Sequence, residues 1–161
     1  TLGVEPARPG IMREPPRRSD RQILDMARLA RLLLHGTLMM VGVLWMFRLG
    51  LESGGIVHGV TLAFTTFVLF QFFNIFNARA EFDSAFIRQF FANGKLWLAL
   101  AGVVGLQVVA VHWGPAQAVF DTVDLSLNDW LLATAIASST LLLEEARKLA
   151  LRILGRESRA I

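Results

Sequence analysis

The sequence predicts an all-α, polytopic membrane protein with four transmembrane helices and both termini in the cytoplasm. More than half of the 161 residues are apolar (54%), and the mean hydropathy is +0.50. The apolar residues gather in four stretches with almost no charge, namely 32–49, 56–76, 96–111 and 127–143. Each approaches the roughly 17–25 residues that a helix needs to cross a bilayer. Because lipid offers no partner to backbone polar groups, each stretch must close its hydrogen bonds internally, as a helix.

The basic residues determine the predicted orientation. Of the sixteen Lys and Arg residues, all but Arg48 lie before the first stretch, between the second and third, or after the fourth. Since cytoplasmic loops carry the excess of Lys and Arg, both termini and the central loop are predicted to lie inside. The chain then divides into a Pro/Arg-rich loop with an amphipathic helix start (1–31), a four-helix transmembrane domain (32–143) and a cytoplasmic helix extension (144–161).

The net charge of +3 predicts a partner as well. The basic residues flank apolar spans and do not form a stripe on a folded surface. We therefore expect attraction to the anionic headgroups of the bilayer and no binding of nucleic acid.

The N-terminal segment is predicted to be extended up to its first helix. Four of the five prolines fall between Pro6 and Pro16, and proline disfavours helix at its own position and at the one before it. Ser19 and Gln22 then form a capping-box pattern. It begins an amphipathic helix that leads into the first span.

Glycine and proline, which interrupt helices, predict the two outer loops. Gly50, Gly54 and Gly55 are expected to interrupt the first of them, around residues 52–58. The Gly114-Pro115 pair is expected to end the third span.

The inner segments are predicted to be helical. Segment 81–93 carries four phenylalanines and is expected to form a short helix at the membrane interface. Beyond residue 143 the last helix is expected to continue into the cytoplasm. There Glu144 and Lys148 have the i,i+4 spacing of a favourable ion pair.

An ordered polar row occurs in the second span. Gln71, Asn74 and Asn77 follow one another at intervals of three residues, which moves the row by only about 60° per step around a helix. Amide oxygens buried in a bilayer need donors or a cation, and carbonyl-type oxygens suit Ca²⁺. The alternative is that these amides hydrogen-bond to neighbouring helices. The row is therefore a candidate for ion binding or for helix packing, and Asn77 favours the second because it lies near the inner boundary.

The three histidines cannot form one metal site. The predicted topology places His58 and His112 outside and His35 near the inner end of its span. A site of His58 and His112, assisted by Asp121 or Asp124, remains an alternative to ordinary packing. No metal site is predicted with any other residues.

No catalytic residue is predicted. The sequence contains no phosphate-binding Gly-x-x-x-x-Gly-Lys-Ser/Thr loop, no His-Glu-x-x-His and no Gly-x-Ser-x-Gly. No carboxylate lies in the middle of a span, whereas ion-translocating bundles usually bury at least one. The chain alone thus shows neither an energy source nor a complete ion site.

Several motifs resemble type II P-type cation ATPases. Leu-Gly-Val-Glu-Pro at 2–6 and Met-Arg-x-Pro-Pro-Arg at 12–17 resemble the cytoplasmic segment that follows the family's sixth membrane helix. The Gln-x-x-Asn-x-x-Asn run at 71–77, followed by Arg79, resembles the eighth helix, most closely that of plasma-membrane-type calcium pumps. Trp130-Leu131 and the Glu-Glu-Ala-Arg-Lys exit at 144–148 are similar to the ninth and tenth helices.

The resemblance implies a C-terminal membrane-support segment of an ATP-driven cation pump, with calcium as the expected ion. Such a segment braces the transport helices and is inactive alone. Its partner would be the N-terminal portion of the pump, and its location the plasma membrane, as a multi-pass protein. The chain itself would hold no cofactor, while the parent would use ATP, Mg²⁺ and the transported cation. Whether the chain counts as an enzyme then depends on that parent.

The resemblance also implies roles for single residues. Gln71 occupies the position where members with two calcium sites have a ligand Glu, so a neutral amide favours a single-site pump. The loop residues are candidates for contact with a cytoplasmic domain, with topology-setting charge as the alternative; they are Arg13, Pro15, Pro16, Arg17 and Arg18. Manganese, magnesium, sodium or protons remain possible ions. The alternative function is an autonomous four-helix scaffold or regulatory subunit without transport chemistry.

Overall fold

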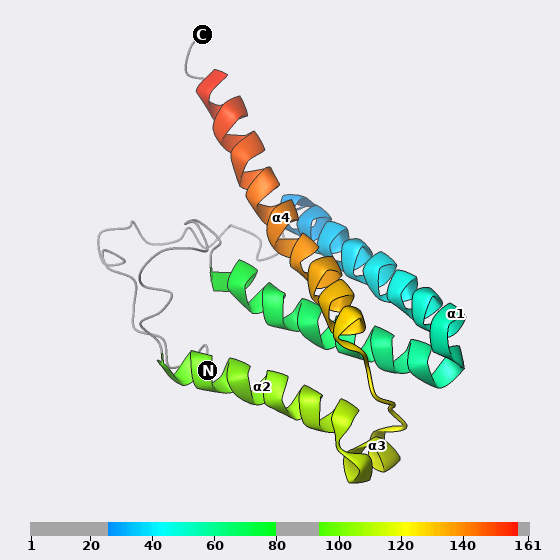
Figure 1. Ribbon diagram of the computed structural model, residues 1–161. Coiled ribbons are helices and arrows are strands. Elements are labelled where there is room, and N and C mark those ends of the chain that lie inside the picture. Colours follow the sequence, from blue (N-terminus) through cyan, green and yellow to red (C-terminus); the bar gives the residue numbers. More distant parts are fainter. Residues whose placement is uncertain (1–25, 80–93, 158–161) are drawn as a thin grey trace.

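All described elements are helices. The computed structural model describes residues 26–79 and 94–157, and Figure 1 shows them as α1 (Met26–Arg79), α2 (Gly94–His112), α3 (Gly114–Phe120) and α4 (Leu127–Glu157). Within these ranges there is no strand, so the predicted all-α class is confirmed. The extended N-terminus, the capping box at Ser19 and the interfacial helix over 81–93 concern residues outside the described ranges.

The longest element, α1, is a helical hairpin (Figure 1). Its backbone is helical on both sides of Gly55, whose φ of 82° and ψ of −171° reverse the chain. A side chain would be strained at this positive φ, and glycine is not. We call residues 26–54 the first limb and residues 56–79 the second limb. The prediction of a loop around 52–58 was therefore wrong in extent, because one glycine accomplishes the reversal.

The two limbs touch through their backbones next to the reversal. A Cβ atom on Gly50 would lie 2.7 Å from the Cα atom of Gly59, and one on Gly59 would lie 2.8 Å from the carbonyl oxygen of Phe47. No real Cβ can be accommodated at such distances. The absence of side chains at Gly50 and Gly59 is thus what allows the limbs to cross so closely.

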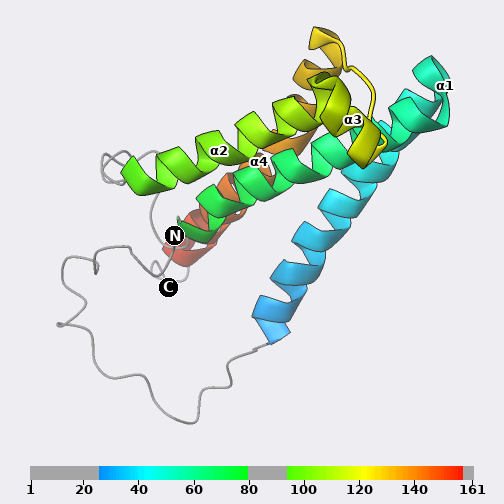
Figure 2. The same cartoon turned by 90° about the horizontal axis from the view of Figure 1, so that it is seen from below.

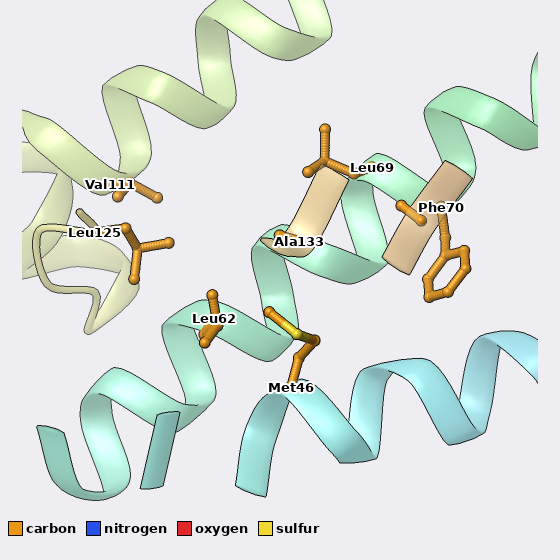
Figure 3. Close-up of a cluster of buried hydrophobic side chains, with 8 residues drawn as sticks. Met46, Leu62, Leu69, Phe70, Val111, Leu125 and Ala133 are labelled. Carbon is orange, nitrogen blue, oxygen red and sulfur yellow. The ribbon is translucent and has the colours of Figure 1, made fainter. Parts of the chain in front are cut away.

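Helix α4 packs against both limbs of the hairpin, and Figure 2 shows it alongside them from a second direction. Figure 3 shows the buried cluster at this junction. Its members come from both limbs of α1, from α2, from α4 and from the segment just before α4: Met46, Leu62, Leu69, Phe70, Val111, Leu125, Ala133 and Ala137. The two alanines are fully buried on α4. Small residues at these positions let the helix approach the hairpin closely.

A short helix that the sequence analysis did not predict connects α2 with α4. Trp113 is extended, with φ −102° and ψ 115°, and Pro115 lies in the first turn of α3. Gly114-Pro115 therefore follows the end of α2, as expected, but also begins a new helix, because proline suits a first turn. Asp121 ends α3 in the left-handed conformation, with φ 51°.

The outer surface of the bundle is apolar. Large side chains such as Leu98, Leu106 and Leu142 are at least 70% exposed. Of the described helices, α1 and α2 are long and apolar enough to cross a membrane, over Leu29–Asn77 and Gly94–His112. In the most apolar 18-residue segment of each helix, only 39% and 28% of the residues, respectively, are buried inside the bundle. A water-soluble monomer rarely exposes so much contiguous apolar surface.

The hairpin contact yields a stability prediction. In Gly50→Ala the new Cβ meets the backbone at Gly59, so we expect a loss of about 1–3 kcal/mol of unfolding free energy, as for other overpacked sites. Unfolding of the protein in detergent measures it. Gly36→Ala is the matched control, because a Cβ there meets nothing within 4 Å and alanine favours helix over glycine by about 0.5–1 kcal/mol. Equal effects of the two substitutions would contradict the backbone contact.

Candidate functional site

The strongest polar feature of the bundle is a buried ionic cluster between its first and last helices. The carboxylate of Glu144 on α4 is 1% exposed. Arg31 on the first limb donates to its Oε1 atom at 2.9 Å, and Arg147 donates to the same atom at 2.6 Å. The Nε2 atom of His35 lies 3.5 Å from Oε2. One carboxylate therefore joins two helices through residues that are more than a hundred positions apart in sequence.

The charge state of Glu144 follows from these neighbours. Burial by itself raises the pKa of its carboxyl group. The hydrogen bond from Arg147 and the positive charges of Arg31, Arg147 and His35 lower it, and they prevail, so the pKa lies below its ordinary value of 4.5. Glu144 lies one residue beyond the predicted span 127–143 and is ionised at neutral pH.

The sequence analysis did not foresee this cluster. It placed Glu144 on a solvated helix surface with Lys148, whose side chain lies outside the described residues. The signal was nevertheless present. Arg31 lies just before the first predicted span, His35 near its start and Glu144 just after the fourth, so the predicted topology puts all three at the same membrane face.

The structure separates the three amides of the polar row. Asn77 is 4% exposed, and its Nδ2 atom donates to the carbonyl oxygen of Thr140 on α4 at 3.1 Å. Asn74 is half-buried, while Gln71 is exposed on the second limb. The residue that precedes Gln71, Phe70, is fully buried in the core. Consecutive helical residues differ by about 100° in direction, so Gln71 lies on a face that α4 leaves open.

Neutral hydrogen bonds join α1 to α2 in the middle of the bundle. Gln107 on α2 is 4% exposed, and its Nε2 atom donates to Oγ1 of Thr65 at 2.9 Å. Towards the α3 end, the backbone N–H of Val123 donates to Oγ1 of Thr61 at 3.2 Å. The hydroxyl of Thr122 donates to the carbonyl oxygen of Ala110. Buried polar groups are satisfied here without any charge.

The opposite end of the bundle carries imidazoles and carboxylates. The Nδ1 atom of His112 lies 2.9 Å from Oδ1 of Asp124, and Nε1 of Trp130 donates to its Nε2 atom at 3.1 Å. His58 lies 3.6 Å, measured from Nε2, from Oδ2 of Asp129. The two histidines thus have different carboxylate partners. Within the described residues no group of three or more His, Cys, Asp or Glu side chains could hold a metal ion.

The remaining candidates cannot be placed. The five loop residues proposed to contact a cytoplasmic domain all precede residue 26, and thus lie outside the described ranges. They are Arg13, Pro15, Pro16, Arg17 and Arg18. Asp121, the other carboxylate considered for a histidine site, ends α3 and is exposed.

An exposed apolar surface around the buried contacts of Glu144, Asn77 and Gln107 defines a helical membrane domain. Comparison with known families is more specific. Residues 1–150 match the family described as "Cation transporting ATPase, C-terminus". The chain belongs to this family, the C-terminal region of P-type cation-transporting ATPases.

Similar proteins carry calcium-pump names. "Calcium-transporting ATPase type 2C member 2" of Mus musculus is 34% identical over 158 residues, which are 97% of this chain and 17% of that protein. "Calcium-transporting ATPase 1" of Schizosaccharomyces pombe is 32% identical over 149 residues, 92% of this chain and 17% of that protein. Its namesake in Saccharomyces cerevisiae is 33% identical over 151 residues, 92% of this chain and 16% of that protein.

These relatives bear out the predicted identity. The C-terminal region of a P-type calcium pump, predicted from the loop and helix motifs, is confirmed. The chain spans about a sixth of the length of the relatives it matches. Their names include type 2C pumps.

The ionic cluster gives a second prediction. Replacing Glu144 with Gln removes the buried negative charge that Arg31 and Arg147 both contact. We expect a loss of about 3 kcal/mol of unfolding free energy, the low end for broken buried pairs, because the two arginine side chains are still 26% and 31% exposed. Since the folded state lowers the pKa of Glu144, its contribution is complete above pH 4.5 and disappears as the pH falls through the folded-state pKa.

Unfolding of wild type and Glu144→Gln in detergent between pH 7 and 3 measures both effects. The variant should lack this part of the acid sensitivity. Glu52→Gln is the matched control, because Glu52 pairs with Arg48 at 3.1 Å in an exposed i,i+4 contact that is worth only about 0.3–0.5 kcal/mol. A Glu144→Gln protein as stable as the control would refute the bracing role of the cluster.

Proposed function

We propose that this chain is the C-terminal membrane-support segment of an ATP-driven calcium pump, which braces the ion-transport helices and has no activity alone. The observation that carries the proposal is the ionic cluster at Glu144, which joins the first and last helices of a chain that belongs to this family. The activity would belong to the whole pump, which would use ATP, Mg²⁺ and Ca²⁺. The N-terminal portion of the pump would be the partner of this segment.

The bracing role is supported by where the polar contacts lie. Glu144 joins α4 to the first limb of α1, and Asn77 joins α4 to the second limb, at the same end of the bundle. Gln107 joins α2 to the second limb further along. Such contacts keep three helices in one arrangement. A pump needs such a fixed set of helices, against which its transport helices can move.

We further propose that the bundle crosses the bilayer four times, with both termini in the cytoplasm. The two limbs of α1, α2 and α4 would be the four spans. With 19 and 31 residues, α2 and α4 extend about 28 and 46 Å, enough for a hydrocarbon core of about 30 Å with little or no thinning. The boundaries 1–31, 32–143 and 144–161 follow from this arrangement. The membrane in question would be the plasma membrane.

We also propose that the open face of the second limb contacts the transport helices. Gln71 lies on this face, beside the half-exposed rings of Phe64 and Phe67. An uncharged amide there can orient or complete the coordination shell of a calcium ion, with Asn74 next along the row. Asn77 would hold the rotation of the limb through its bond to α4. Arg13, Pro15, Pro16, Arg17 and Arg18 would contact the phosphorylation domain.

The proposed topology can be tested by labelling. The chain has no cysteine, so single cysteines introduced by Ser53→Cys beside the hairpin reversal and by Ala160→Cys near the C-terminus report one position each. In sealed vesicles an impermeant maleimide should label the two positions from opposite sides. Labelling of both from the same side would contradict the four-span arrangement. Labelling after the addition of detergent controls for accessibility.

Gln71→Ala tests the function in the intact protein that contains this chain. We expect the wild type to hydrolyse ATP in a calcium-stimulated manner. The variant should need a several-fold higher calcium concentration for half-maximal phosphorylation, because one amide oxygen has left the ion or its ligands. Assays with manganese, magnesium and sodium in place of calcium identify the ion.

Asn128→Ala removes a second exposed amide, near the start of α4, and is the matched control with an expected wild-type calcium response. If Gln71→Ala changes only the amount of protein, the residue has a packing role. If no cation stimulates hydrolysis by the intact wild type, the pump proposal itself fails.

A further inference from the structure

Two imidazoles flank the first turn of α4 from different neighbours. His112 ends α2 and contacts Trp130, while His58 begins the second limb of α1 and faces Asp129. Trp130 and Asp129 are consecutive residues. This turn of α4 therefore contacts two imidazoles, the side-chain type that most readily serves as a switch near physiological pH.

The contacts of His112 determine its tautomer. An indole N–H can only donate, so the Nε2 atom of His112, 3.1 Å from Nε1 of Trp130, must carry the lone pair. The proton of the neutral ring is then on Nδ1 and is donated to Oδ1 of Asp124, at 2.9 Å. The arrangement is complete only while His112 is neutral.

Protonation of His112 changes its two bonds in opposite directions. A proton on Nε2 would face the indole N–H of Trp130, so two donors would meet and this bond would be lost. The bond to Asp124 would become charge-assisted and stronger. His112 is 37% exposed, so protons reach it from solvent. Protonation of His112 would thus remove the hydrogen bond between the end of α2 and the first turn of α4.

Protonation of His58 acts on the neighbouring residue. Its Nε2 atom is buried and has no hydrogen-bond partner among the described residues. The Oδ2 atom of Asp129 lies 3.6 Å away, beyond hydrogen-bonding distance. That oxygen also accepts bonds from the N–H and the hydroxyl of Ser126, which caps α4. A positive charge on His58 would attract this carboxylate towards the second limb of α1.

Four other described residues at this end carry charge. Asp121 at the end of α3 and Asp124 after it are both exposed, and Arg48 and Glu52 pair with each other on the first limb. No described basic side chain other than the two histidines faces Asp124 or Asp129. The response to acid at this end is therefore carried by His58 and His112.

We propose that the first turn of α4 is a pH-sensitive latch. At neutral pH it is held to α2 through the Trp130–His112 bond. In acid this bond opens, and the turn is held to α1 through the Asp129–His58 ion pair. The device lies at the end opposite the Glu144 cluster and is independent of the proposed transport role.

Fluorine NMR of the intact protein in detergent micelles tests the latch, because both ends then experience the same pH. With 5-fluorotryptophan incorporated, the resonance that disappears in Trp130→Phe belongs to Trp130. Between pH 8 and 5 this resonance should shift. In His112→Gln the shift should become much smaller, since an amide can accept from Trp130 and donate to Asp124 at every pH, and only the effect of His58 on Asp129 remains.

Two further experiments distinguish the latch from general acid effects. His35→Gln, an imidazole substitution at the opposite end, should leave the Trp130 titration unchanged. In the unmutated protein, the ¹⁵N shifts of His112 should show the Nδ1–H tautomer at pH 8. The proposal is overturned by the Nε2–H tautomer, by a Trp130 resonance that does not respond to pH, or by an equal response in His112→Gln.

Discussion

The backbone contact between the two limbs of α1 is the constraint on which the rest of the bundle depends. Gly55 reverses the chain, and Gly50 and Gly59 let the limbs cross without side chains between them. Close crossing brings Met46 and Phe70, from different limbs, into one buried cluster with α4. A bulkier crossing would separate the limbs and remove the surface on which Ala133 packs.

The polar contacts of the bundle change in kind from one end to the other. One end depends on full charges around Glu144, the middle on neutral bonds such as Gln107 to Thr65, and the opposite end on the imidazole of His112. This order follows the cost of burying each group. Full charges occur only near a predicted boundary, where arginine side chains still reach water, and amides and hydroxyls occupy the apolar middle.

Much of this arrangement was predictable, since lipid-compatible helices must be long, apolar and nearly free of charge. The positions of the helices and the family followed from the apolar stretches and the motifs around Gln71. The single-residue reversal at Gly55 was not predictable, because three nearby glycines offered equivalent breaks. Short α3 was missed because Gly114-Pro115 predicts the end of one helix as well as the start of another.

The site was less accessible from sequence than the fold. Spacing put Gln71 and Asn77 in one row, yet their different surroundings depend on where α4 packs, which periodicity does not specify. The burial of Glu144 likewise depends on Arg31, a residue far away in the chain. Pairings of this kind become visible only when topology is used to ask which residues share a membrane face.

The Glu144 contact also bears on the order in which the bundle is completed during synthesis. Arg31 and His35 emerge from the ribosome long before Glu144. The carboxylate that both side chains approach in the folded bundle is therefore supplied only when the last helix has been made. The contact of Glu144 with the first limb of α1 can form only after α4 has been synthesised, which makes it a late step in the closure of the bundle.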